Sequence, residues 1–130
     1  MSFVRAGKFA AAFSLALVPA AGLACGVCLE DKVASAYDHA LASRAIAAGR
    51  VVVFAEVVGK GEAHARVRSA RAAAARVPGV DRASIRSNDA PAVLAFALDP
   101  RASTPQAALA RAQRPTGEGS FQLALLKVLR

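Results

Sequence analysis

The sequence predicts an α+β fold in which helices pack on a single four-stranded sheet. Hydrophobic residues make up 55% of the chain and aromatic residues only 5%, so Ala, Val and Leu must form most of the core. Two nearly continuous apolar runs are typical of strands buried on both faces. Segments of helical and strand periodicity alternate in an order that matches one compact domain, and 130 residues leave room for no second one.

The N-terminal segment predicts an export signal. Arg5 and Lys8 form a positive region, residues 9–18 an apolar region, and residues 19–24 a small-residue region that ends in a cleavage site. An apolar stretch of about ten residues is too short to span a bilayer, which needs about twenty. We therefore expect residues 1–24 to be a signal peptide and residues 25–130 to be exported to an oxidising space, most simply a bacterial periplasm.

Cys25 directly follows the expected cleavage site, which raises the alternative of lipoprotein processing. In that process the first cysteine of the mature chain is acylated. The usual signal has Leu three residues before the cysteine, and this chain has Gly22 there. Attachment to a membrane is therefore expected only if Cys25 carries a lipid.

Residues 31–48 predict one amphipathic helix. Glu30 and Asp31 suit the positive end of a helix dipole, and Gly49 is well placed to end the helix. One face carries Val33, Ala36, Tyr37, Ala40, Leu41 and Ala45. We expect this face to pack on the sheet.

The next elements alternate between strand and helix. Residues 50–58 are nearly all Val, Phe and Ala, which indicates a central strand. After a glycine-rich loop, residues 63–77 have apolar positions at helical spacing and end at Pro78-Gly79. Residues 80–87 alternate polar and apolar, as an edge strand does.

The C-terminal third of the chain again alternates between strand and helix. We expect a turn at residues 87–89 and a second central strand at residues 92–98, which are apolar throughout. Ser103-Thr104-Pro105 is a helix start signal, and a helix is expected through Ala112. Residues 121–129 supply the last strand.

After the first helix, this order is the split βαβ pattern of a ferredoxin-like fold. Its sheet order is 4-1-3-2, which places the two apolar strands in the centre. Right-handed crossovers would put the second and third helices on one face. The first helix is then the only element left to cover the other face, so the prediction is a ferredoxin-like βαββαβ sandwich with an extra N-terminal helix.

The segment Arg76 to Ile85, with the sequence RVPGVDRASI, resembles the exit of the second helix in heavy-metal-associated domains. In that family a Pro-Gly-Val turn leads into the second strand, and the resemblance covers residues 51–129. The family binds a soft metal ion through a Met-x-Cys-x-x-Cys loop after the first strand. The matching residues 58–64 contain neither Cys nor Met. The resemblance therefore implies the fold, and metal transfer as its function, without the family's own ligands.

Cys25 and Cys28 form a Cys-x-x-Cys pair that can chelate a soft metal ion such as Cu(I) or Zn(II). A helix of residues 31–48 and the strand after it have similar lengths, about 27 and 26 Å. An antiparallel return would thus bring Cys28 back beside the loop that ends at His64. We therefore predict Cys25, Cys28 and His64 as metal ligands, and His39 as a surface or packing residue.

Two alternatives remain for the same pair. It could cycle between dithiol and disulfide with a redox partner protein, or form a structural disulfide or lipid anchor in an interaction module. No spacing of nucleophile and base, phosphate-binding glycine loop or carboxylate pair indicates an enzyme. Scattered arginines, the lack of Trp and a lone Tyr37 argue against nucleic acid as a partner. The predicted function is sequestration of a soft metal ion or its transfer to a partner protein.

Overall fold

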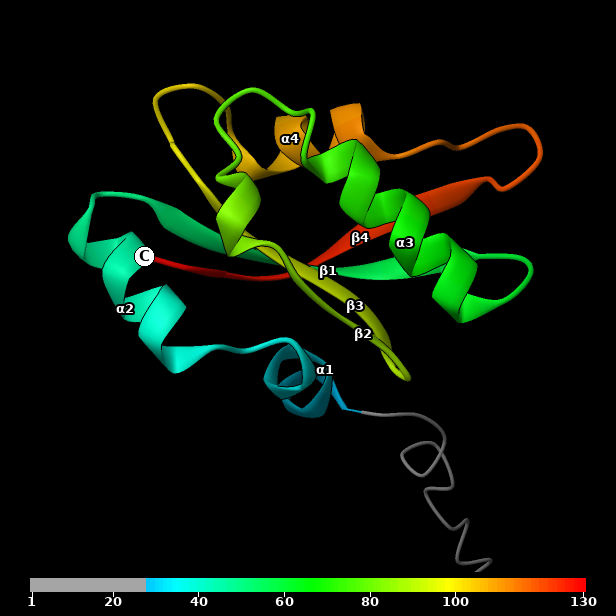
Figure 1. The fold of residues 1–130 in the computed structure, drawn as a ribbon, viewed down its shortest axis with the longest axis horizontal. Coiled ribbons are helices and arrows are strands. Elements are labelled where there is room, and N and C mark those ends of the chain that lie inside the picture. The colour runs from blue at the N-terminus through cyan, green and yellow to red at the C-terminus, as the bar shows by residue number, and fades with distance from the viewer. Residues whose placement is uncertain (1–27) are drawn as a thin grey trace, which may run out of the picture.

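The computed structural model describes residues 28–130, so the predicted signal peptide and Cys25 lie outside the described residues. This part of the chain is an α+β unit with a four-stranded antiparallel sheet and four α-helices (Figure 1). In chain order the elements are α1 (Leu29–Ser35), α2 (His39–Ala47), β1 (Val51–Gly59), α3 (Ala63–Ala74), the 3₁₀ helix η1 (Arg82–Ser84), β2 (Arg86–Asp89), β3 (Ala92–Leu98), α4 (Pro105–Ala112) and β4 (Phe121–Leu129).

The sheet has the strand order β2-β3-β1-β4, and every neighbouring pair is antiparallel. This is the expected order, and the architecture is compatible with a ferredoxin-like fold. The apolar strands β1 and β3 lie in the centre, with Val51 opposite Leu98 and Glu56 opposite Val93. Central strands have no solvent-facing side, which explains why these two runs carry almost no polar residue.

Helices cover both faces of the sheet, with α3 and α4 on one side and α1 and α2 on the other (Figure 1). The alternation of side chains along β1 divides its residues between two cores. The first core contains Val53, Ala55, Val57, Leu94, Phe96, Val67, Ala70, Ala74 and Leu109. The second contains Val33, Ala36, Ala42, Ala45, Val52, Phe54, Val93, Ala95 and Ala97. The predicted cover of the second face is therefore confirmed.

That cover is two helices, so the prediction of a single helix over residues 31–48 was wrong. The chain leaves the helical conformation after Ser35, and Asp38 starts α2 by accepting a hydrogen bond from Leu41 N at 3.0 Å. Asp is a strong N-cap residue because its carboxylate satisfies a backbone N–H that has no partner in the helix. The break leaves Tyr37 44% exposed, although its ring still stacks on Phe54 of β1, with the ring centroids 6.4 Å apart.

The prediction of a strand over residues 80–87 was also wrong for most of these residues. Asp81 caps η1 by accepting from Ala83 N at 3.1 Å. Ser84 is buried, and its hydroxyl oxygen accepts from Ala97 N at 2.8 Å. The Ser84 side chain thus accepts the hydrogen bond of Ala97 N–H in β3, which a backbone carbonyl would accept if residues 80–87 formed a strand. Only Arg86–Asp89 pairs with β3 as β2. Residues 87–89, where a turn was expected, thus belong to the strand, and the chain reverses after them, between Asp89 and Ala92.

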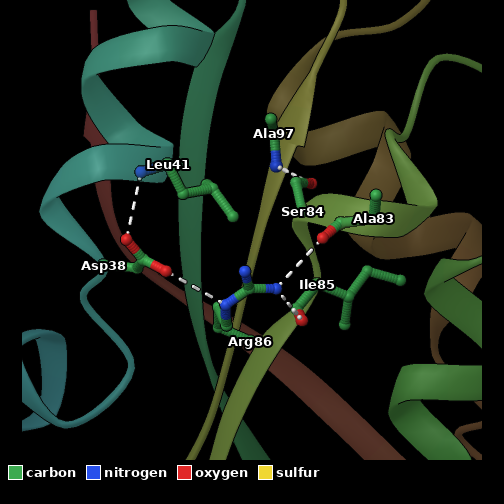
Figure 2. Close-up of polar contacts among 7 residues, drawn as sticks. All are labelled: Asp38, Leu41, Ala83, Ser84, Ile85, Arg86 and Ala97. Atoms are coloured by element: carbon green, nitrogen blue, oxygen red, sulfur yellow. Dashed lines mark hydrogen bonds and ion pairs between the residues drawn. The ribbon is translucent and has the colours of Figure 1, made fainter.

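Figure 2 shows how these two unpredicted features meet. Arg86 donates from Nε to Asp38 Oδ2 at 3.3 Å. Its Nη1 donates to the carbonyl oxygens of Ala83 and Ile85 at 3.0 and 3.1 Å. One guanidinium therefore joins the start of α2 to both sides of the η1–β2 junction.

Candidate functional site

Cys28 lies at the start of α1, where it is the N-cap residue and is exposed. Its thiol donates a hydrogen bond to Asp31 Oδ2 at 3.1 Å. The two residues are three positions apart, a spacing that places side chains on the same side of a helix. Asp31 is a candidate metal ligand that was not predicted from the sequence, although its spacing from Cys28 could have indicated it.

The helix that carries Cys28 is fixed to the sheet. Val33 is 7% exposed and belongs to the second core. Lys32 Nζ lies 2.9 Å from Glu56 Oε2 on β1, with both side chains only partly exposed. The backbone N–H of Lys32 donates to Cys28 O at 3.0 Å. The thiol is therefore accessible to solvent while its backbone is held by a docked helix.

His64 lies in the first turn of α3, which packs on the opposite face of the sheet from α1. Its side chain is 69% exposed, and its Nδ1 lies 2.9 Å from Asp89 Oδ2 at the end of β2. The histidine and Cys28 thus each contact a different carboxylate. The structure brings neither side chain into contact with the other, and the ligand set with His64 stays a prediction.

His39 opens α2 and is exposed. Its Nδ1 lies 3.2 Å from the hydroxyl of Tyr37. The two rings are tilted, with centroids 6.3 Å apart. This histidine belongs to a surface pair with Tyr37, and the structure shows it beside neither Cys28 nor His64.

A metal ion bound by a protein needs a group of donors that converge. Structural Zn(II) takes four ligands, usually thiolates and imidazoles with an occasional carboxylate. Within residues 28–130, no group of three or more His, Cys, Asp or Glu side chains could hold such an ion. Cys28 and Asp31 supply two donors at one place. Any larger set at the start of α1 must include Cys25, which lies outside the described residues.

No family model, curated protein or solved structure matches this chain. The resemblance of residues 76–85 to heavy-metal-associated domains stays a prediction from the sequence. Among the helices of residues 28–130, none is long and apolar enough to cross a membrane.

Proposed function

We propose that the chain is an exported protein that binds a soft metal ion, Cu(I) or Zn(II), through the thiolates of Cys25 and Cys28. Its role is to sequester the ion or to transfer it to a partner protein. The observation that supports this most is the position of Cys28. Its thiol is exposed beside a carboxylate, at the start of a helix that is docked to the sheet. A partner could reach an ion at this position without unfolding the domain.

The ligand set that we propose is Cys25, Cys28 and Asp31. Thiolates select soft and borderline ions, and a carboxylate oxygen is an accepted third ligand for Zn(II). The hydrogen bond between Cys28 and Asp31 marks two donors already within reach of one ion. His64 contacts Asp89 through Nδ1, which leaves Nε2 available as a further ligand, because metal-bound histidines commonly donate their other ring nitrogen to a carboxylate.

In a ferredoxin-like fold, the cysteine pair would also lie near the position where heavy-metal-associated domains bind their metal. In heavy-metal-associated domains the metal lies at the end of the first strand. Here Lys32 of α1 and Ala63 at the start of α3 border the same surface hollow, of about 400 Å³, together with Gly59 at the end of β1. Cys28 lies one helical turn before Lys32. The pair would therefore approach that end of the sheet from the second face.

Intact mass of the protein recovered after export tests this proposal. The expected product begins at Cys25, carries two thiols under denaturing conditions, and gains the mass of one metal ion under native conditions. Loss of two hydrogens would instead identify a disulfide, and a diacylglycerol adduct on Cys25 would identify a lipoprotein. Either result would replace the metal proposal by the interaction-module or redox assignment.

A further inference from the structure

A cleft of about 630 Å³ lies between the C-terminal half of α3 and the end of α4. Figure 1 shows these two helices side by side over the same face of the sheet, with the segment after α4 leading away from them to β4. The cleft is on the opposite face from α1. It is therefore separate from the proposed metal site.

The floor of the cleft is apolar. Val77, Ala112 and Phe121 line it, and these residues are 6%, 3% and 2% exposed. All three belong to the first core, so the floor is the outer surface of a packed hydrophobic layer. A volume of this size is within the usual range of pockets that bind small molecules.

Three arginines line the same cleft: Arg76, Arg111 and Arg114. All three are exposed, and within residues 28–130 none of them forms an ion pair. Helices α3 and α4 contain no acidic residue. A cation at a helix C-terminus is favourable, which accounts for one positive charge at the end of each helix. It does not account for a third guanidinium from the segment that follows α4.

The backbone that carries these arginines is held in place. Arg114 and Phe121 exchange two backbone hydrogen bonds, of 3.1 and 2.7 Å. Arg76 N donates to Ala73 O at 3.1 Å, which continues the last turn of α3. Arg111 lies in the last turn of α4. The backbone beneath the positive rim is therefore fixed before any ligand binds, so binding must order only the arginine side chains.

We propose that this cleft binds a small organic anion in which a carboxylate or phosphate group adjoins an apolar group. A guanidinium pairs with either anion through two parallel hydrogen bonds, and three guanidiniums without an ion-pair partner among residues 28–130 favour a doubly charged group. The apolar part of the ligand would contact Val77 and Phe121 and remove their remaining surface from water.

Titration calorimetry of the purified exported protein with naphthyl phosphate tests the proposal. Inorganic phosphate supplies the charge alone, and naphthol supplies the apolar group alone. The test variant replaces Arg76, Arg111 and Arg114 by Gln. The matched control replaces Arg68, Arg101 and Arg130 by Gln, which removes the same charge from exposed arginines outside the cleft. Neither variant changes a buried residue, so both should fold.

The expected result is saturable binding of naphthyl phosphate that is tighter than binding of phosphate or naphthol. The test variant should lose at least about tenfold in affinity, as expected for lost charge-assisted hydrogen bonds. The control variant should stay close to the wild type. Equal losses in both variants would mean that net charge alone attracts the anion, and would overturn the proposal. Absence of saturable binding to the wild type would overturn it as well.

Discussion

Arg86 Nε lies 3.3 Å from Asp38 Oδ2, so an ion pair joins two residues that are 48 positions apart. It connects the start of α2 to the edge strand β2, on the face of the sheet that a simple βαββαβ domain would leave open. The other oxygen of the same carboxylate caps α2 through Leu41 N. One side chain thus starts a helix and also docks it.

This arrangement predicts a pH-dependent stability. The pKa of Asp38 lies below its usual value of 3.8, because Leu41 N donates a hydrogen bond to the carboxylate and Arg86 adds a second one and its charge, while desolvation acts in the opposite direction. A carboxyl group with a lowered pKa stabilises the fold above its unfolded pKa, and this contribution is lost as the pH falls through the folded pKa.

Asp38→Asn keeps an acceptor for the cap but removes the charge, whereas Asp38→Ala removes both. At neutral pH the thermal midpoints should fall in the order wild type, Asp38→Asn, Asp38→Ala. The difference between wild type and Asp38→Asn should shrink as the pH falls below about 4. Thermal melts monitored by circular dichroism at several pH values would measure this. A difference that stays constant into strong acid would show that the charge contributes nothing.

A second prediction concerns the docking of α2. Leu41 is 8% exposed and Ile46, on the same helix, is 40% exposed. Leu41→Ala should lower the free energy of unfolding by about 2 kcal/mol, the lower end of the range for buried leucines, because Leu41 also borders a surface hollow. Ile46→Ala should cost less than about 0.5 kcal/mol. Urea denaturation of both variants measures the two values, and equal losses would mean that α2 is not docked through Leu41.

A third prediction separates two effects at glycines with positive φ. Gly79 has a φ of +90°, and a Cβ atom there would lie 2.7 Å from Ala102 Cβ. Gly61 has a φ of +84° and open space around it. Both Ala variants should lose about 1–2 kcal/mol from backbone strain.

Gly79→Ala should lose about 1–3 kcal/mol more, because its methyl group overpacks the turn against the segment after β3. Chemical denaturation measured for the two variants side by side gives this difference directly. If the Gly61 variant proved as unstable as the Gly79 variant, close packing at the Pro78-Gly79 turn would not matter.

The sequence predicts the central strands of this fold better than the helices on its second face and the segment before β2. Continuous apolar runs identified β3 at its observed ends and β1 to within one residue, because burial on both faces leaves little room for polar residues. The edge strand β4 was also predicted at its observed ends. Apolar spacing alone could not show the break between α1 and α2, since Val33 and Leu41 keep helical spacing across it. The cap at Asp38 was the missed signal. Ser84 gave no signal at all, because its role depends on Ala97 in a different strand.

The candidate metal site was predictable only in part, because local sequence does not determine contacts between distant segments. The position of Cys28 before a helix followed from local sequence, and the structure places it at the N-cap of α1. Contacts between distant segments did not follow. His64 was expected near Cys28 from helix and strand lengths that assumed one straight helix. The structure has two helices there, and it shows a contact of the His64 ring with Asp89 on β2. The pairing of a histidine with a hairpin carboxylate depends on the register of β2 and β3, which periodicity does not give.

The fourth prediction concerns the ligands of the proposed metal site. Cys28→Ser should abolish tight binding, because it removes a thiolate that no other residue of the chain can replace. Asp31→Asn should weaken binding if the carboxylate is a ligand, and His64→Ala should weaken it if the imidazole is a further ligand through Nε2. His39→Ala is the matched control, since this histidine is exposed and paired with Tyr37. Metal affinity of each variant, measured by chelator competition, ranks these contributions.

The most direct test of the central claim is competition between the fully reduced wild-type mature protein and a weak chromophoric chelator at neutral pH. We expect the protein to withdraw one Cu(I) or Zn(II) ion per chain from the chelator, and the Cys28→Ser variant to leave the chelator fully loaded. If the wild type also leaves the chelator fully loaded with both ions, soft-metal binding is wrong, and the cysteine pair serves as a disulfide or an anchor.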